Sequence, residues 1–131
     1  MAEPIRFDPE KHTEIIGKWC DGWKIGRYPD GWLPTVGFIV PDVAYASLYI
    51  SDSSVAWIEN VISNPEASDE DRDKAIFDIN DKIEETAIEC GAKWLRGSSL
   101  RKGILERAEK RGYWIDERPS HQIVKLLKAK E

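Results

Sequence analysis

The chain has 131 residues, of which 41% are hydrophobic and 33% charged, and its formal net charge is −5. This length suits one domain with a real hydrophobic core, so we expect a single domain over residues 1–131. The acidic balance argues against a nucleic-acid partner, because neutralising phosphates requires clustered Lys and Arg.

Signals for export, membrane insertion and metal binding are missing from the sequence. Cys20 and Cys90 form neither a metal motif nor a disulfide framework, and we expect both to be reduced. His12 and His121 lie far apart and have no spaced Cys or carboxylate motif beside them. The N-terminus lacks the apolar run of a signal peptide, and no segment approaches the roughly 20 apolar residues of a transmembrane helix. We therefore predict a cytoplasmic protein that binds neither a metal nor a membrane.

One helix and four short strands are predicted for the first half of the chain. Ile15, Ile16 and Trp19 share one helical face and predict a helix over residues 11–20. Residues 21–34 are rich in Gly, Pro and Asp and predict a loop with aromatic anchors. Three β-rich runs with short turns between them then predict an antiparallel meander. The predicted strands cover residues 5–7, 35–40, 44–50 and 55–63.

A long amphipathic helix is predicted for residues 69–90. Ser68 is a good N-cap, and Asp71 three residues later resembles the second half of a capping box. Apolar residues at spacings of three and four form a buried face that includes Cys90, and Gly91 is a suitable C-cap residue. The remaining predicted elements are a strand over 93–96, in which Trp94 is expected in the core, a helix over 101–111, and closing strands over 113–115 and 121–127.

These elements define an α+β protein with a mixed, mostly antiparallel central sheet flanked by helices. Its second and third helices end in the segments Glu-Cys-Gly-Ala-Lys-Trp-Leu (89–95) and Lys-Arg-Gly-Tyr-Trp (110–114). Together with Pro65 after the fourth strand, this order resembles the GNAT acyltransferase fold over residues 5–127. The resemblance implies an N-acetyltransferase that moves an acetyl group from acetyl-CoA to an amine acceptor.

In GNAT enzymes the pyrophosphate of coenzyme A lies where the fourth strand joins the next helix, at a loop of pattern Gln/Arg-x-x-Gly-x-Gly/Ala. Placed on residues 70–75, this pattern puts Glu70 at the Gln/Arg position and Asp73 at the first glycine, while Ala75 fits the last position. The cofactor-binding residues that the resemblance implies are Ile62, Ser63, Arg72, Asp73, Lys74 and Ala75.

The same joint has a second interpretation as an acidic helix start that caps itself. Ser68 and the acidic residues at 69–71 can satisfy the free N–H groups of the first turn. Like charges about 5 Å apart also repel by on the order of 1 kcal/mol per pair in a watery medium, which opposes a bound pyrophosphate. The sequence leaves both interpretations open.

Glu59 is the catalytic residue that the resemblance implies, because some GNAT enzymes use a glutamate on the fourth strand as general base. A carboxyl within an apolar strand can have a raised pKa, which suits this role. The alternative is an ordinary outward-facing strand residue, since a strand alternates its faces. Ala108 stands where the family has a tyrosine that protonates the thiolate, and Arg101 stands where it has an asparagine.

The loop around Trp23, Tyr28 and Trp32 is the predicted recognition element for the amine acceptor or a protein partner. The alternative is a loop pinned onto the core. The sequence leaves two functions open. The first is the N-acetyltransferase. The second is a GNAT-fold binding or regulatory protein without cofactor binding, for which small phage and prophage proteins are a setting by fold-level association only.

Overall fold

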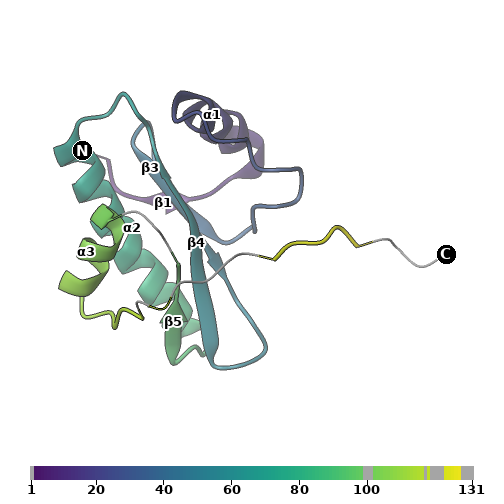
Figure 1. The fold of residues 1–131 in the computed structure, drawn as a ribbon, viewed down its shortest axis with the longest axis vertical. Helices are drawn as coiled ribbons and strands as arrows, with labels where there is room; N and C mark the ends of the chain where they lie inside the picture. The colour runs from purple at the N-terminus through teal and green to yellow at the C-terminus, as the bar shows by residue number, and fades with distance from the viewer. Residues whose placement is uncertain (1, 99–101, 117, 119–122, 128–131) are drawn as a thin grey trace. The chain divides into compact units, whose positions relative to one another are not determined.

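The computed structural model describes residues 2–98, 102–116, 118 and 123–127. The chain divides into two compact units, residues 1–98 and residues 99–131. The first unit holds a five-stranded sheet and two helices, and the described part of the second holds one helix (Figure 1). The predicted α+β class is confirmed, whereas the single domain over 1–131 stays a prediction.

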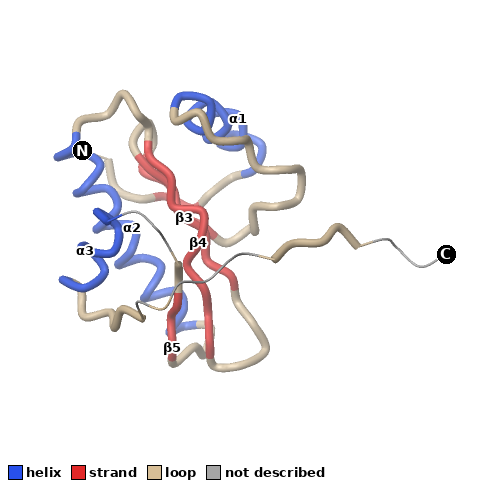
Figure 2. The backbone as a smooth tube through the Cα atoms, in the orientation of Figure 1, coloured by secondary structure: helices blue, strands red, loops and turns tan. Residues whose placement is uncertain are grey.

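The strands of the sheet lie side by side in chain order (Figure 2). The first four are antiparallel to one another, as the predicted meander requires, and the fifth is parallel to the fourth. A parallel neighbour needs a long crossover, which the second helix provides. The strands are β1 (Ile5–Arg6), β2 (Gly37–Val40), β3 (Ala44–Tyr49), β4 (Val55–Ser63) and β5 (Trp94–Arg96).

The helices α1 (Pro9–Gly22) and α2 (Asp69–Glu89) cover opposite faces of this sheet (Figure 1). Successive residues of a strand point to opposite faces, so the sheet has two separate apolar layers. The layer under α2 contains Val40, Leu48 and Ile83 among its buried side chains. The layer under α1 contains Ile16 and Tyr45. The sheet is therefore the centre of a three-layer arrangement.

Capping groups set the start of α1. The side chain of Asp8 accepts a hydrogen bond from the Glu10 N–H at 3.0 Å, and Pro9 occupies the first turn. Nδ1 of His12 in turn accepts from the Asp8 N–H at 2.9 Å. Each bond satisfies an N–H that a helix start or its cap would otherwise leave unpaired. The helix consequently begins two residues before the predicted 11–20 segment.

Helix α2 starts and ends close to its predicted positions. Ser68 Oγ accepts from the Asp71 N–H at 3.1 Å, as the capping pattern predicts. At the other end Gly91 has a φ of 89°, and the Ala92 N–H reaches back to the Ala87 carbonyl at 2.9 Å. A glycine tolerates this left-handed backbone, which ends the helix. Cys90 lies at this turn and is exposed, so its predicted burial is wrong.

The second unit contains α3 (Lys102–Lys110), which confirms a helix within the predicted 101–111 segment; residue 101 lies outside the described residues. The predicted closing strands are wrong where the structure describes them. Residues 113–115 and 123–127 form no strand, and residues 121–122 lie outside the described part. A β-rich sequence forms a strand only when a partner accepts its backbone hydrogen bonds, and composition does not reveal that partner.

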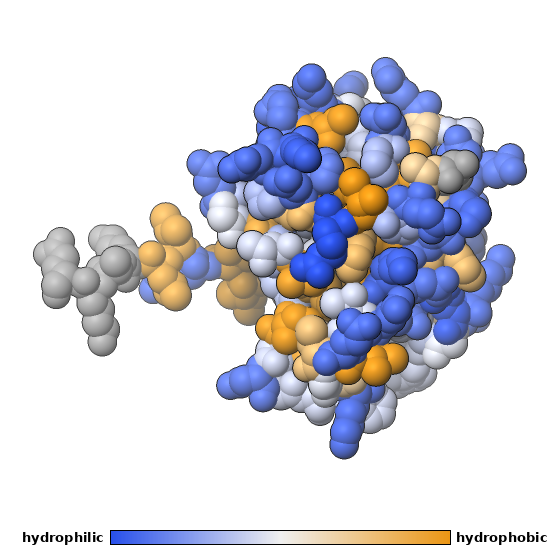
Figure 3. All heavy atoms as spheres, turned by 180° about the vertical axis from the view of Figure 1, so that it is seen from behind, coloured by the Kyte–Doolittle hydropathy of each residue, from blue (hydrophilic) through white to orange (hydrophobic). Residues whose placement is uncertain are grey.

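Most of the surface seen in Figure 3 is hydrophilic, with separate hydrophobic patches between the polar side chains. Single exposed apolar residues are common on protein surfaces. Trp94 on β5 is one of them, because 68% of it is exposed. Its predicted place in the core is therefore wrong, since the short β5 presents this side chain to solvent.

Candidate functional site

Strand β4 pairs with β5 over only three residues. The pairs are Val55 with Trp94, Ala56 with Leu95 and Trp57 with Arg96. Among the described residues, β4 has no strand partner on this side from residue 58 onwards. The last six residues of β4 thus present backbone N–H and C=O groups that β5 leaves unused.

Gly97 brings the chain close to β4 directly after the last pair. A Cβ at position 97 would lie 2.9 Å from the Ile58 carbonyl oxygen, a distance that real side chains do not adopt. A glycine is therefore required for this close approach of the two backbones. The end of β5 is held against Ile58 at the point where the strand pairing stops.

Asn60 forms a bulge in β4 just beyond this point. Its φ is 56°, in the left-handed region, and the register with β3 shifts between Tyr45 and Ser47. A β-bulge places two residues opposite one and turns the strand. Asn tolerates the left-handed region better than most residues, because its side chain can form local hydrogen bonds.

The amide of Asn60 joins three segments of the chain. Its Nδ2 donates to Ser47 Oγ at 3.1 Å and to the Tyr49 hydroxyl at 2.9 Å, both on β3. Its Oδ1 accepts from Trp32 Nε1 at 3.4 Å. The Tyr49 hydroxyl also donates to the Trp32 carbonyl at 2.9 Å. The bulge is thereby fixed both to the neighbouring strand and to the loop before β2.

Tyr45 extends this network into the core under α1. Its hydroxyl and Ser47 Oγ lie 2.6 Å apart, and both residues are fully buried. Burial raises the pKa of Tyr45 to about 12, so its hydroxyl keeps its proton at physiological pH. Ser47 Oγ pairs with both the buried Tyr45 hydroxyl and the partly buried Asn60 amide, which lets a polar network exist inside an apolar layer.

Glu59 lies on the same face as this network. It is the cross-strand partner of Ser47, and directly opposed residues share a face of the sheet. The side chain is half-buried, and this burial raises the pKa of its carboxyl, while the positive charge of Arg96 lowers it to a lesser extent. The carboxyl is therefore only partly solvated, and no cationic side chain in the described part of the chain forms an ion pair with it, as a proton acceptor requires.

At the joint between β4 and α2, several polar groups already form interactions within the protein. The Arg72 N–H donates to the Ser68 carbonyl at 3.0 Å, so this amide already belongs to the helix. The Arg72 guanidinium pairs with Asp69 and lies 5.5 Å from the centre of the Trp23 ring. Trp23 Nε1 donates to the Ser63 carbonyl at 2.7 Å. Trp23 thus links the end of β4 to the first turn of α2.

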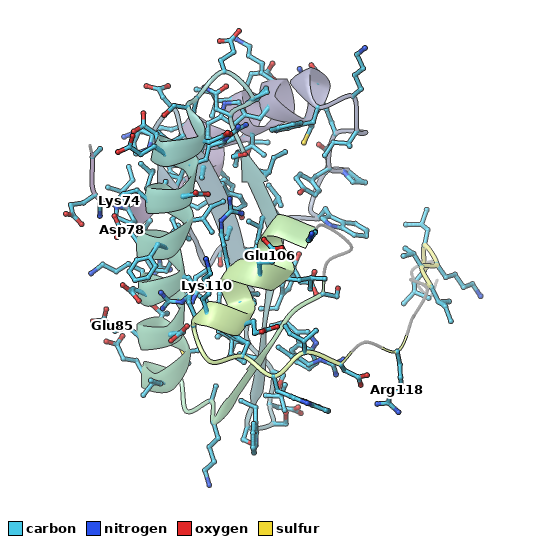
Figure 4. The ribbon with its side chains drawn as sticks, turned by 60° about the vertical axis from the view of Figure 1, so that its left-hand side comes forward. Lys74, Asp78, Glu85, Glu106, Lys110 and Arg118 are labelled. Carbon is cyan, nitrogen blue, oxygen red and sulfur yellow. The ribbon has the colours of Figure 1, made fainter. Side chains whose placement is uncertain are left out.

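The other sequence-predicted cofactor residues lie within elements. Ile62 is buried under α1, and Ala75 is fully buried on the core face of α2. Lys74 pairs with Asp78 at 2.6 Å, and Figure 4 shows both on the same side of α2. Asp73 is exposed. The structure therefore brings Arg72 to the end of β4, while Ala75 lies inside the core.

The aromatic loop is held against the first unit at several points. Trp23 and Tyr28 are partly buried against the layer under α1. Trp32 is hydrogen-bonded to Asn60 in the bulge and keeps 37% of its surface exposed. This geometry matches the pinned-loop alternative at Trp23 and Tyr28. It leaves Trp32 as an exposed aromatic surface beside Glu59's strand.

The described residues contain no group of three or more His, Cys, Asp or Glu that could hold a metal ion. None of their helices is long and apolar enough to span a membrane. Ala108 lies on α3, and Arg101 lies outside the described residues.

Solved structures of acetyltransferases share this fold. An acetyltransferase from Trypanosoma brucei matches with a TM-score of 0.66 and 19% identity, covering 93% of this chain and 99% of that one. A putative acetyltransferase from Agrobacterium tumefaciens matches with a TM-score of 0.64 and 14% identity, covering 94% and 99%. A transcriptional regulator from Bacillus halodurans matches with a TM-score of 0.60 and 15% identity, covering 96% and 99%.

These likenesses show that the chain has the GNAT acyltransferase fold, as its sequence resemblance implied. No protein-family model matches the sequence. A search of curated protein sequences finds no match either. A fold of this kind does not determine a function, so the function has to be inferred from the site itself.

Proposed function

We propose that the protein is an N-acyltransferase that transfers an acetyl group from acetyl-CoA to an amine, with Glu59 as the general base. The observation that carries the proposal is the position of Glu59. It lies between the last β4 residue paired with β5 and the bulge at Asn60. A half-buried carboxyl whose pKa is raised can accept a proton from an amine near neutral pH.

The extended arm of coenzyme A would bind along the open side of β4. Residues 58–63 leave backbone groups without a β5 partner among the described residues, and an extended amide-bearing chain can pair with such an edge. Ile62 and Ser63 belong to this stretch. The first turn of α2 fits the pyrophosphate poorly, because Ser68 caps it and acidic residues occupy positions 69–71.

Bound acetyl-CoA would supply the acyl group as a reactive thioester. The residues of this chain would prepare the acceptor. Glu59 would take a proton from the amine, which leaves the nitrogen lone pair free to attack, and the hydrogen bonds of Asn60 would hold the neighbouring backbone in place. The departing sulfur would take a proton from water.

Replacing Glu59 tests this function. We expect Glu59→Gln to lower kcat with a pool of small amines by about 10²- to 10⁴-fold, the usual share of a general base. Release of free thiol from acetyl-CoA measures the rate. Glu85→Gln is the matched control, because Glu85 is an exposed residue of α2 and should leave the rate unchanged. Unchanged acetylation in Glu59→Gln would remove Glu59 from the base role.

A second function is favoured by the closed joint between β4 and α2. Trp23 Nε1 already donates to the Ser63 carbonyl, and the Arg72 guanidinium already pairs with Asp69. A cofactor at this joint would use the same carbonyl and the same guanidinium. The protein would then be a GNAT-fold binding or regulatory protein whose partner contacts the loop around Trp23, Tyr28 and Trp32. Calorimetric titration with acetyl-CoA separates the two functions. No heat at millimolar cofactor contradicts the enzyme, and micromolar binding lost in Arg72→Glu contradicts the cofactor-free protein.

A further inference from the structure

Five side chains lie on or beside the part of β4 between its pairing with β5 and its bulge. Tyr49 and Trp57 are cross-strand partners, and Glu59 follows Trp57 two residues later on the same face. Arg96 is the β5 partner of Trp57, and Trp32 reaches Asn60 from the loop. We call these five residues the acceptor face, and the list is Trp32, Tyr49, Trp57, Glu59 and Arg96.

The acceptor face carries two opposite charges that do not form an ion pair. Arg96 lies with its guanidinium carbon 5.6 Å from the centre of the Trp57 ring. Its charge acts on Glu59, yet among the described residues no carboxylate pairs with Arg96. A guanidinium stacked on an aromatic ring keeps its N–H donors available for a carboxylate.

The spacing of the strands sets the distance between the two charges. Glu59 is two residues along β4 from Trp57, and Arg96 is one strand across from it. Two residues of strand span about 6.6 Å and neighbouring strands lie about 4.8 Å apart, so the two Cα atoms lie roughly 8 Å apart. The Arg96 guanidinium lies over the Trp57 ring instead of pairing with Glu59, so the two charged groups can each contact one end of a small molecule that carries both charges.

We propose that the acceptor of the acyl transfer is a small amino acid, whose amine meets Glu59 and whose carboxylate meets Arg96. This inference rests on the proposed function, because it names the amine which that function leaves open. Trp57 and Trp32 supply apolar surface for the body of the ligand, and the Tyr49 hydroxyl lies beside it. A plain amine satisfies only Glu59, so it leaves the guanidinium of Arg96 without a partner.

The step conserves atoms and charge. The amine nitrogen forms a bond to the acyl carbon, the bond from that carbon to sulfur breaks, and the proton of the amine passes to Glu59. Sulfur leaves as a thiolate and takes a proton from water. The carboxylate of the amino acid is unchanged throughout and serves only to hold the ligand, so Arg96 is a specificity residue rather than a catalytic one.

The first measurement is binding without acetyl-CoA. The common L-amino acids and the amines formed from them by decarboxylation are titrated into the full-length protein, with thermal shift and calorimetry as readouts. We expect at least one amino acid to bind tenfold or more tightly than its amine. Amines that bind as tightly as their parent amino acids would overturn the inference, and so would the absence of binding by every amino acid.

The second measurement uses variants of Arg96 with acetyl-CoA present. Arg96→Gln should raise KM for the amino acid at least tenfold and change kcat little, while KM for the matching amine stays the same. Arg96→Lys should recover part of the loss, because it restores the charge but not the fork of donors. Arg6→Gln is the control, since Arg6 also lies over an aromatic ring, that of Phe38 at 5.5 Å, but on β1.

The two proposals can fail separately. Acyl transfer to plain amines that is insensitive to Arg96→Gln would overturn the amino-acid acceptor and keep the N-acyltransferase. Amino-acid binding that depends on Arg96, with no transfer from acetyl-CoA, would overturn the transferase and keep the ligand class of the acceptor face.

Discussion

The two faces of the sheet differ in what they bury. Among the described residues, the buried side chains under α2 are all apolar, from Val40 on β2 to Ile83 on the helix. Under α1 the apolar layer gives way along β3 and β4 to Tyr45, Ser47 and Asn60, which are joined by hydrogen bonds. The first face can serve stability alone. The second gives up apolar contact to hold polar groups beside Glu59, which is the arrangement expected near a functional site.

The largest effect that separates the faces should come from the α2 side. Ile83 is fully buried, and Ile83→Ala removes apolar contacts and leaves a cavity, so we expect a loss of about 2 to 5 kcal/mol in the free energy of unfolding. Urea unfolding measures this loss. Glu85→Ala, two residues away and exposed, should change stability by no more than about 0.5 kcal/mol. A similar small change in Ile83→Ala would mean that the α2 layer is not the main core.

A smaller effect is expected at the polar face. Asn60→Ala removes three side-chain hydrogen bonds and forces alanine into a left-handed backbone, which we expect to cost about 1 to 3 kcal/mol. Asn60→Gly loses the same bonds but accepts the backbone, so it should be the more stable of the two variants. Equal urea midpoints for the two variants would show that the left-handed conformation is not a constraint here.

The smallest effect is a pH dependence at Glu59. Burial raises its pKa in the folded state above the ordinary value of 4.5, so the folded chain holds this proton more tightly than the unfolded chain. Stability that depends on this group is therefore present below pH 4.5 and is lost as the pH rises through the raised pKa. Glu59→Gln should gain stability over the wild type near neutrality and lose that gain in acid. Urea unfolding at both pH values checks the sign, and a constant difference would contradict the burial effect.

The sequence was most informative where local chemistry determines structure. Ser68 and Gly91 mark the two ends of α2, because a cap side chain and a left-handed glycine act within a few residues of themselves. The strand over residues 55–63 was predicted with the observed bounds, since turn residues lie on both sides of a β-rich run. Such signals do not depend on the rest of the fold.

The candidate site was only partly predictable. Glu59 could be named from a resemblance, but the network around Asn60 depends on contacts between β3, β4 and a loop that are distant in sequence. One signal was present. Asn is rare within strands, and an Asn after Glu59 in an otherwise β-rich run indicates a bulge. The same limit explains the wrong predictions at residues 113–115, at residues 123–127 and at Cys90. Local composition reveals neither the partner of a strand nor the exposure of a side chain to solvent.

The shortness of the outer strands has a consequence for how the chain behaves among its own copies. β1 has two residues and β5 has three, and each contains an arginine, Arg6 and Arg96. Long, flat outer strands invite other chains to add to a sheet, which is a common route to aggregation. Strands this short and this charged offer little backbone for such growth at the two outer strands of the sheet.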